Sequence, residues 1–358
     1  MDTINKPVLK ILCIDGGGIR GIIPCIILQE IEKRMNKPLS EVFDLIAGTS
    51  TGGIISVGLT IPDANGKPKL DAGGLLELYT KYGGEIFKKR RFKTVSQLFY
   101  PGYSADGLER LLKERYGDTQ LKDALTEILI TSVDTQTNKP FYFLSRLAKD
   151  INYQKTENFL MREVARSTSA APTFFPANEV KWGKKTLSLV DGGLYANNPS
   201  TLAFSEANEL WTEIKNQPKK VKSGIAGIND RDLETVVTAT IDAAPFFMLS
   251  LGTGQSDKPI PYTSAEKWGM LPWIWKGRII DLVMHSVSES THYQMQYVLP
   301  DYPNGTKRYV RLNTSLTKGH EGMDDTSPSN LNALMDMGHQ VVKDNDGLID
   351  IACERLRQ

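Results

Sequence analysis

Ser50 is the residue of this chain whose neighbours best suit it to act as a nucleophile. It lies in Gly-Thr-Ser-Thr-Gly at 48–52, which fits the pattern G-x-S-x-G. Mostly apolar runs at 43–47 and 53–59 flank it and predict a buried strand, a sharp turn and a helix. Such a turn exposes the serine hydroxyl, and the helix that follows directs free N–H groups towards it. This arrangement is typical of acyl transfer, in which a serine attacks a carbonyl and an anionic intermediate forms.

A second glycine-rich turn follows the first predicted strand, at 8–14. It reads Asp15, Gly16, Gly17, Gly18, and a helix is predicted at 22–35 with a proline in its first turn. A glycine-rich turn between strand and helix gathers backbone N–H groups in one concavity, which binds negative charge. Two such turns at neighbouring strand ends could converge on one oxygen and form an oxyanion hole.

The same glycines allow two other interpretations. Gly16, Gly18 and Gly21 satisfy G-x-G-x-x-G, the pattern of dinucleotide-binding proteins. Asp15 would then repel the pyrophosphate, and Asp44 opens the next predicted strand, whereas the ribose-binding acid belongs at its far end. A tight turn that binds nothing is the third interpretation.

Asp191 is the candidate general base. It ends a strand-like run at 186–190 and is followed by Gly192 and Gly193, which permit close approach to another loop. A free aspartate has a pKa of about 3.9, so desolvation would have to make it a stronger base. The alternative is an Asp-Gly turn without chemistry.

In this order, residues 15–21, 48–52 and 191–193 resemble the patatin-like phospholipases. The stretches 165–176 (ARSTSAAPTFFP) and 194–199 (LYANNP) extend the likeness, which is dense over 8–200 and reaches 250–254. The resemblance implies a three-layer α/β/α sandwich around a mostly parallel sheet, with no metal and no cofactor. It also implies a Ser–Asp dyad of Ser50 and Asp191, which would cleave glycerophospholipid acyl esters through an acyl-enzyme.

The resemblance further assigns the oxyanion hole, and the residues around it suggest its supports. The backbone amides of the glycine loop, Gly16 to Gly18 and chiefly Gly17 and Gly18, would stabilise the oxyanion with help from Thr51. Arg20 would hold the loop through backbone carbonyls or present charge to a phosphate, and the first of these is favoured. The remaining supporting positions are glycines at the two turns: Gly48, Gly52, Gly192 and Gly193.

A Ser–His–Asp triad is the mechanistic alternative. All four histidines follow Asp191, and His285 or His292 could complete a triad in the chain order of α/β-hydrolases. Both lie in a predicted amphipathic helix, where a histidine is more often a surface or core residue.

Composition fits a cytoplasmic enzyme. The chain has 358 residues, 40% of them hydrophobic, and a net charge of +1, so no global field attracts a nucleic acid polymer. Cys13, Cys25 and Cys353 are too few for a disulfide framework or a zinc site, and the first two are expected in the core. We find neither a signal peptide nor a stretch long enough to span a bilayer, so we expect peripheral action on the inner membrane face.

Two segments could dock on a membrane. Residues 87–93 hold five cations and two aromatic residues, and 267–278 hold three tryptophans beside cations. A solvated helix end and a loop packed over the core are the respective alternatives.

The expected organisation is a catalytic core at 1–210 and a part at 211–358 that completes the same domain. The second part adds a strand at 245–251 and helices, one opened by Ser327-Pro328, and could serve as a lid or regulatory surface. Surface connections are expected at 60–74 and 215–232. An oligomer is compatible with this sequence.

The C-terminal extension also resembles bacterial patatin-like effectors that a cyclic nucleotide activates to degrade the cell membrane in anti-phage defence. A constitutive lipase of lipid turnover and a catalytically dead scaffold are the alternatives.

Overall fold

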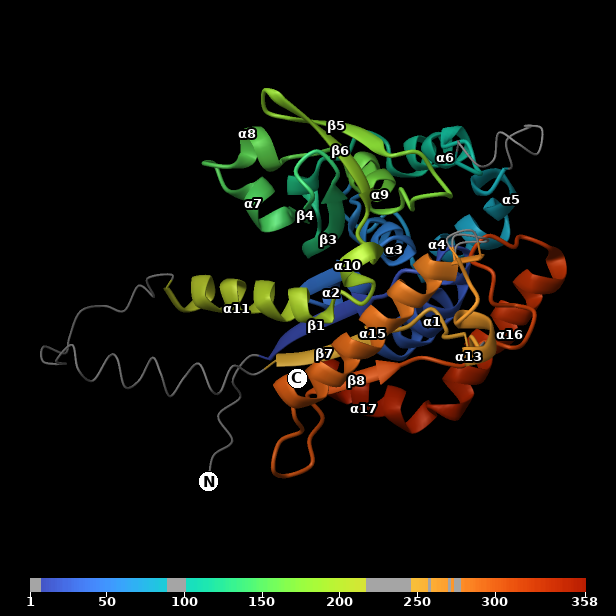
Figure 1. Ribbon diagram of the computed structural model, residues 1–358. Coiled ribbons are helices and arrows are strands. Elements are labelled where there is room, and N and C mark those ends of the chain that lie inside the picture. The colour runs from blue at the N-terminus through green and yellow to red at the C-terminus, as the bar shows by residue number, and fades with distance from the viewer. Residues whose placement is uncertain (1–7, 89–100, 217–245, 257–258, 270–271, 274–277) are drawn as a thin grey trace, which may run out of the picture.

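One mixed β-sheet forms the centre of the molecule (Figure 1). The computed structural model describes residues 8–88, 101–216, 246–256, 259–269, 272–273 and 278–358. Within these residues eight strands pair in the order β5-β6-β3-β2-β1-β7-β8, with β4 also on β3. The strands are β1 (Leu9–Ile14), β2 (Leu45–Gly48), β3 (Glu127–Asp134), β4 (Lys139–Leu144), β5 (Asn178–Trp182), β6 (Lys185–Asp191), β7 (Phe246–Leu251) and β8 (Tyr309–Leu312).

The middle of the sheet is parallel. β3, β2, β1, β7 and β8 run in the same direction, whereas β4, β5 and β6 are antiparallel to their neighbours. Ile14 of β1 is paired with Gly48 of β2, so these two strands end side by side at one edge. The turns that follow them, which carry the glycine loop and Ser50, are therefore neighbours in space.

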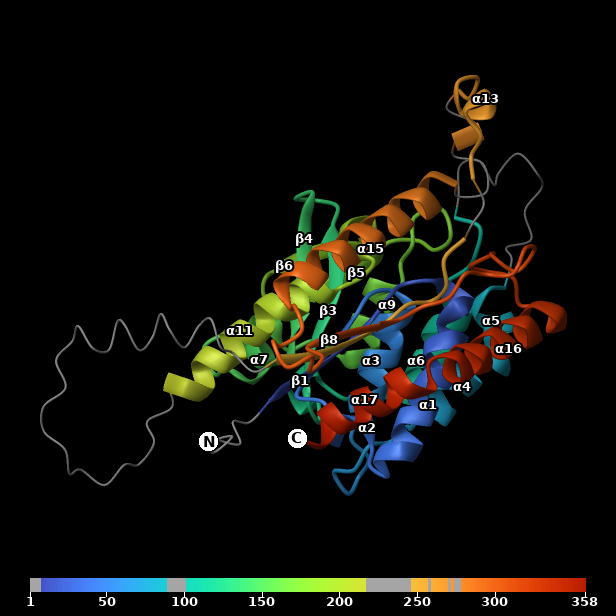
Figure 2. The same ribbon diagram turned by 90° about the horizontal axis from the view of Figure 1, so that it is seen from below.

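Helices cover both faces of the sheet, and Figure 2 shows the three layers from below. α11 and α15 lie on one face, and α1, α3, α4, α6, α16 and α17 on the other. The helices are α1 (Ile22–Met35), α2 (Leu39–Val42), α3 (Thr51–Thr60), α4 (Ala72–Thr80), α5 (Gly83–Ile86), α6 (Asp106–Tyr116), α7 (Ser145–Lys149), α8 (Gln154–Glu157), α9 (Met161–Thr168), α10 (Gly193–Ala196), α11 (Ser200–Asn216), α13 (Tyr262–Ala265), α15 (Arg278–Val298), α16 (Pro328–Asp344) and α17 (Asp346–Arg357), with 3-10 turns η1 (Gly18–Gly21) and η3 (Leu121–Asp123).

The apolar core lies on both sides of β1. Leu12 and Ile14 belong to the larger cluster with α1 and α3, and Ile11 and Cys13 belong to the smaller one with α11 and α15. Alternate side chains of a strand point to opposite faces of the sheet. A strand that is apolar at nearly every position must therefore be covered by helices on both faces. The predicted three-layer α/β/α fold is confirmed.

Local predictions near the site are confirmed as well. The strand at 8–14 is β1 and the helix at 22–35 is α1, in which Ile23, Ile27 and Ile31 are fully buried. The connection expected at 60–74 is wrong at its end, because α4 begins at Ala72. There the Asp71 side chain accepts a hydrogen bond of 2.7 Å from the Gly74 amide and caps the helix.

The C-terminal third contributes to the same sheet and helix layers. The strand expected at 245–251 is β7, which pairs with β1, and Ser327 caps α16 as expected. α16 packs along α1, and β8 extends the sheet beyond β7. Residues 217–232 of the second expected connection lie outside the described part. A lid or regulatory role for this third stays a prediction.

Candidate active site

Ser50 occupies a strained turn between β2 and α3. Its backbone angles, φ 55° and ψ −122°, are unusual for a residue with a side chain, and such conformations are costly unless their surroundings fix them. The turn is also too crowded for other side chains. A Cβ on Gly52 would lie 2.1 Å from the Ile14 carbonyl oxygen, and one on Gly48 would lie 2.3 Å from the Gly52 carbonyl oxygen. The two flanking glycines are therefore required by the close approach of the chain.

Asp191 ends β6, where it is paired with Ser132 of β3. Asp191 is buried, with only 2% of the residue exposed to solvent. Burial raises the pKa of Asp191 to about 7, against the lowering effects of the Ser50 hydroxyl and the Gly193 amide. The Gly193 amide donates to Oδ1 at 2.7 Å. Oδ2 is buried and has no hydrogen-bond partner of ordinary geometry among the described residues.

The glycine loop presents two uncommitted amides. In the described part of the chain, the N–H groups of Gly17 and Gly18 have no protein acceptor, and neither has that of Thr51 at the start of α3. Gly16 differs from the expectation, because its amide donates to the Asn197 carbonyl at 3.1 Å and is not available to an oxyanion. Arg20 donates from Nε to the Gly17 carbonyl at 3.1 Å, which is the favoured structural contact.

Gly18 cannot be replaced without moving the loop. Its φ is +59°, and a Cβ there would lie 2.2 Å from the carbonyl oxygen of Met323. The same carbonyl oxygen accepts a hydrogen bond of 2.8 Å from the Ile19 amide. The segment around Met323, far along the chain, therefore packs directly on the glycine loop.

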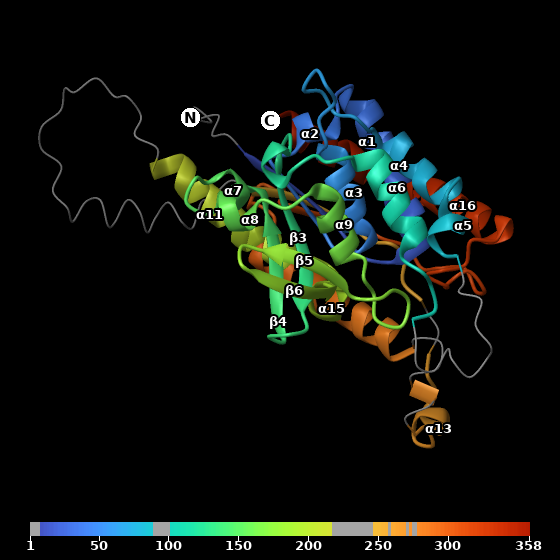
Figure 3. The same cartoon turned by 90° about the horizontal axis from the view of Figure 1, so that it is seen from above.

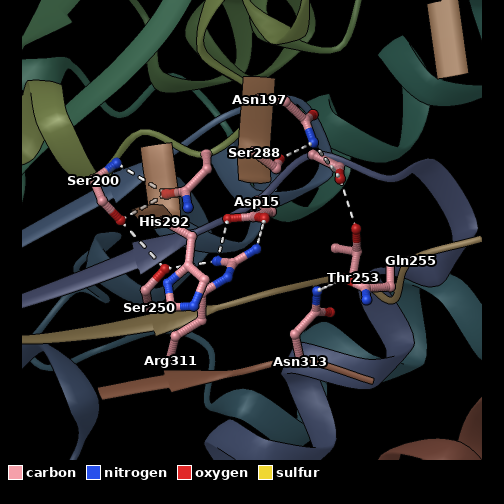
Figure 4. Close-up of polar contacts among 12 residues, drawn as sticks. Asp15, Asn197, Ser200, Ser250, Thr253, Gln255, Ser288, His292, Arg311 and Asn313 are labelled. Atoms are coloured by element: carbon pink, nitrogen blue, oxygen red, sulfur yellow. Dashed lines mark hydrogen bonds and ion pairs between the residues drawn. The ribbon is translucent and has the colours of Figure 1, made fainter. Parts of the chain in front are cut away.

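A polar network lies behind the glycine loop (Figure 4). Thr253 donates to the Gly16 carbonyl at 2.6 Å, and Asn197 Nδ2 donates to Ser288 Oγ at 2.9 Å. Arg311 binds both carboxylate oxygens of Asp15. Except for Gly16, these residues were not predicted as site residues. Asp15, Asn197 and Thr253 lie in stretches that carry the resemblance (15–21, 194–199 and 250–254), whereas Ser288 and Arg311 lie outside them.

Ser50 and Asp191 line the same cavity, which has about 550 Å³ of empty space when the part open to solvent is included. Gly18 and Thr51 also line it, so the structure brings the nucleophile, the acid and two of the expected amide donors together. Most other lining side chains are apolar: Ile54, Tyr79, Ile86, Phe87, Leu108, Ala171, Phe174, Phe175, Met284 and Met323. Such a lining suits an aliphatic chain better than a polar ligand.

The histidines lie elsewhere. All four are in described segments, and none lines this cavity. His292 Nδ1 lies 3.1 Å from the Tyr309 hydroxyl, and His320 Nδ1 lies 3.0 Å from Asn330 Oδ1. The arrangement gives no support to a triad through His285 or His292.

Other predicted features are only partly visible. Residues 89–93 of the basic segment and Trp275 lie outside the described residues. No helix in the described chain is both long enough and apolar enough to cross a bilayer. Nor do the described residues include three or more His, Cys, Asp or Glu side chains grouped to hold a metal ion.

Comparison with known proteins gives consistent matches along almost the whole chain. The family described as patatin-like phospholipase matches residues 12–204. Patatin-like protein 2 of Oryza sativa subsp. indica is 31% identical over 365 residues, which cover 96% of this chain and 86% of that protein. Patatin-like protein 1 of Arabidopsis thaliana is 32% identical, covering 94% and 83%.

Two further matches are a relative named as probably inactive and a solved structure with only slight similarity. The Solanum tuberosum protein named probable inactive patatin-3-Kuras 1 is 31% identical and covers 97% of this chain and 91% of its own length. Among solved structures, VipD from Legionella pneumophila aligns at a TM-score of 0.37 and 11% identity over 94% of this chain and 67% of that one, too slight a likeness to carry an argument. The matches to the family and to its plant members support lipid acyl hydrolase activity. This chain belongs to the patatin-like phospholipase family.

Proposed function

We propose that this protein is a phospholipase A-type hydrolase that uses Ser50 as nucleophile and Asp191 as general base. The observation that carries the proposal is the common cavity. A serine on a strained turn and a buried carboxyl group with a pKa of about 7 face the same apolar space. Groups with pKa values shifted towards neutrality are typical of acid–base catalysts.

The reaction proceeds in two halves. Ser50 Oγ attacks the acyl carbonyl carbon as its proton passes to Asp191 Oδ2, which leaves a tetrahedral oxyanion. The ester C–O bond then breaks, and the leaving alkoxide takes the proton from Asp191. Water attacks the acyl-enzyme with Asp191 again as base, and this releases the fatty acid and restores Ser50.

Oxyanion stabilisation is assigned to the backbone amides of Gly17, Gly18 and Thr51. None of the three has another acceptor in the described chain, and all belong to the two turns that meet at the sheet edge. Loss of one such donor typically lowers kcat by about 100- to 1,000-fold. In this mechanism Gly16 fixes the loop through Asn197, and Arg20 holds the Gly17 carbonyl.

The substrate class follows from the lining of the cavity. Phe174, Phe175, Met284 and Met323 offer an apolar wall to a long acyl chain, whereas a small polar ester would gain little there. We therefore expect membrane glycerophospholipids to be cleaved in preference to short-chain esters.

Docking on the membrane is assigned to the segment around α13. Figures 2 and 3 show this helix projecting from the body beyond α15, and Tyr262 in it is 77% exposed. Trp268 and Trp273 pack edge to face at 5.2 Å, and the Arg278 guanidinium lies 4.7 Å from the Trp268 ring. Tryptophan with cations is typical of membrane–water interfaces. Trp273→Ala should weaken binding to phosphatidylglycerol vesicles, and unchanged partitioning would exclude this role.

The central test is hydrolysis of vesicles of labelled phosphatidylcholine and phosphatidylethanolamine. We expect release of fatty acid and covalent labelling by a fluorophosphonate, with both lost in Ser50→Ala. Asp191→Asn should keep the fold and lose turnover. Full activity of Ser50→Ala would overturn the proposal. A folded wild type without activity on any ester would favour a binding scaffold instead.

Cyclic-nucleotide activation and a role in anti-phage membrane degradation stay hypotheses that rest on the resemblance of the C-terminal extension. Constitutive lipid turnover is their rival. Measurement of phospholipid hydrolysis with and without a panel of cyclic di- and trinucleotides separates them, since only the regulated enzyme needs a nucleotide for full rate.

A further inference from the structure

The register of the sheet places Arg311 on the same face as Asp15. Arg311 of β8 is paired with Ser250 of β7, and Ser250 is paired with Cys13 of β1. Asp15 follows Cys13 by two residues, so both side chains point to the face that α11 and α15 cover. Two strand spacings amount to roughly 10 Å, which the arginine and aspartate side chains together can bridge.

The ion pair between Arg311 and Asp15 is bidentate and enclosed. Nη2 lies 2.7 Å from Oδ2 and Nη1 lies 3.2 Å from Oδ1, and Nη1 also donates to Ser250 Oγ at 2.8 Å (Figure 4). The side chains are only 4% and 3% exposed. A fork of two parallel hydrogen bonds fixes orientation as well as distance, which a lysine cannot do.

Asp15 is also the first residue of the glycine loop. Its amide donates to the Leu251 carbonyl at 3.0 Å, and the Gly16 carbonyl that follows accepts from Thr253 at 2.6 Å. The side chain and backbone of Asp15 are thus held by β8 and β7. The amides of Gly17 and Gly18, which the proposed function assigns to the oxyanion, lie only two and three residues further on.

Arg311 also neutralises the negative charge of Asp15. A buried carboxylate at the start of the loop that binds the developing oxyanion would repel it in a medium of low dielectric constant. Burial raises the pKa of Asp15, and the Arg311 guanidinium opposes that shift, which favours the ionised pair. Without Arg311 the loop would lose its anchor, and the buried Asp15 carboxyl group would be left without its counter-charge, either repelling the oxyanion or taking up a proton.

We infer that Arg311 is the positioning residue of the oxyanion loop, fixing its geometry through Asp15 and cancelling the charge of that carboxylate. This inference rests on the proposed function but concerns a residue beyond the stretch matched to the family, 12–204. It makes β8, at the far edge of the sheet, part of the apparatus that stabilises the transition state.

The test compares Arg311→Met, Arg311→Lys and the double variant Asp15→Asn/Arg311→Met, with kcat expressed per active site after exhaustive fluorophosphonate titration. A loop displaced by about 1 Å costs on the order of 100-fold in rate, so we expect Arg311→Met to lose about that factor in kcat. KM should change by less than about threefold, because the acyl cavity is untouched. Arg311→Lys should retain part of the rate. The double variant should exceed Arg311→Met, because no buried carboxyl group is left without its partner.

A second measurement separates positioning from folding. Ser50 Oγ adds to the carbonyl of a long-chain trifluoromethyl ketone, and the hemiketal oxyanion then occupies the oxyanion hole. The inhibition constant of this ketone should therefore rise in parallel with the loss of kcat/KM in the Arg311 variants. The control is Arg146→Met, which removes a half-buried arginine paired with Glu206 at 2.7 Å, away from the cavity. It should reduce melting temperature without changing kcat or ketone affinity.

The outcomes are distinct. If wild type hydrolyses phospholipid through Ser50, but Arg311→Met and Arg311→Lys keep kcat and ketone affinity within threefold of it, the inference is wrong and the proposed function stands. If Arg311→Met does not fold, the lysine and double variants decide by the same criteria. The inference is also wrong if the Arg311 variants lose activity only because fewer active sites react with the fluorophosphonate, while kcat per reactive site stays normal. If Ser50→Ala is as active as wild type, the proposed function itself fails.

Discussion

The hydroxyl of Thr168 accepts a hydrogen bond of 2.9 Å from the backbone amide of Ser50. Both residues are buried, and α9, which ends at Thr168, packs against α3. At the sharp turn the Ser50 amide has no partner in the sheet or in the helix. Thr168 thus supplies the missing acceptor and fixes a backbone conformation that would otherwise be unfavourable.

Replacement of Thr168 by valine should lower kcat by about tenfold with little change in KM. A buried N–H left unpaired costs about 1–3 kcal/mol, and part of that cost is relieved by relaxation of the turn. Steady-state kinetics on a long-chain ester and thermal melting check this. Thr168→Ser restores the acceptor and should recover most of the rate. Full rate in the valine variant together with a loss in the serine variant would show that the methyl group, and not the hydroxyl, matters.

The activity should depend on pH through Asp191. The base must be ionised to accept the serine proton, and its pKa of about 7 places the acid limb of the kcat/KM profile near neutrality. We expect kcat/KM to fall about tenfold for each unit of pH below that limb. A profile that is flat down to pH 5 would contradict the assignment of Asp191 as base.

The same residue should make the protein less stable as the pH rises. In the unfolded chain Asp191 ionises near its ordinary value of 3.8, and in the folded protein near about 7. Between these values the folded state holds a proton that the unfolded chain has released, so raising the pH lowers the free energy of unfolding until the folded pKa is passed. Asp191→Asn should therefore melt above wild type at pH 8, and the gap should close towards pH 4. A gap independent of pH would refute the burial argument.

Gly18→Ala tests the loop geometry. The added Cβ meets the Met323 carbonyl at 2.2 Å in a residue with φ of +59°, so the loop must move and we expect kcat to fall by at least about 100-fold. Gly66→Ala is the matched control, because Gly66 also has a positive φ, +73°, but open space around it. It should lose only about 1 kcal/mol of stability and keep full kcat. Equal kinetic losses in both would point to general destabilisation.

Alanine at His285 and at His292 should leave kcat within about threefold of wild type. Neither ring lines the cavity, and His292 is engaged by the Tyr309 hydroxyl. Loss of the histidine of a triad lowers kcat by about a millionfold in a serine protease, so the two mechanisms are easily separated by steady-state kinetics. A large loss in either variant, with an intact melting transition, would favour a triad.

The site-forming elements could be predicted because their signals are local. A strand, a glycine turn and a helix stand next to one another around Ser50, and again before α1, so short-range rules suffice for both. α4 shows where such rules fail. Its glycines, Gly73 and Gly74, read as a continuing loop, but burial of Leu75 and Leu78 against the core outweighs their weak helix propensity.

The contacts that hold the loop could not be predicted, because they depend on strand register. Arg311 reaches Asp15 across 296 residues of chain, and nothing around either residue in the sequence indicates the other. Thr253 and Met323 contact the loop for the same reason, through the pairing of β7 and the return of the chain after β8. The commitment of the Gly16 amide to Asn197 likewise became visible only with the fold.

The packing of the Met323 carbonyl against Gly18 also bears on how relatives of this enzyme could diverge. Ser50 and Asp191, to which the proposal assigns the chemistry, and the segment around Met323 that packs on the glycine loop lie in separate stretches of the chain, which natural variation can alter independently. Exchange of the 313–327 stretch between homologues would adjust catalytic rate while leaving Ser50 and Asp191 unchanged.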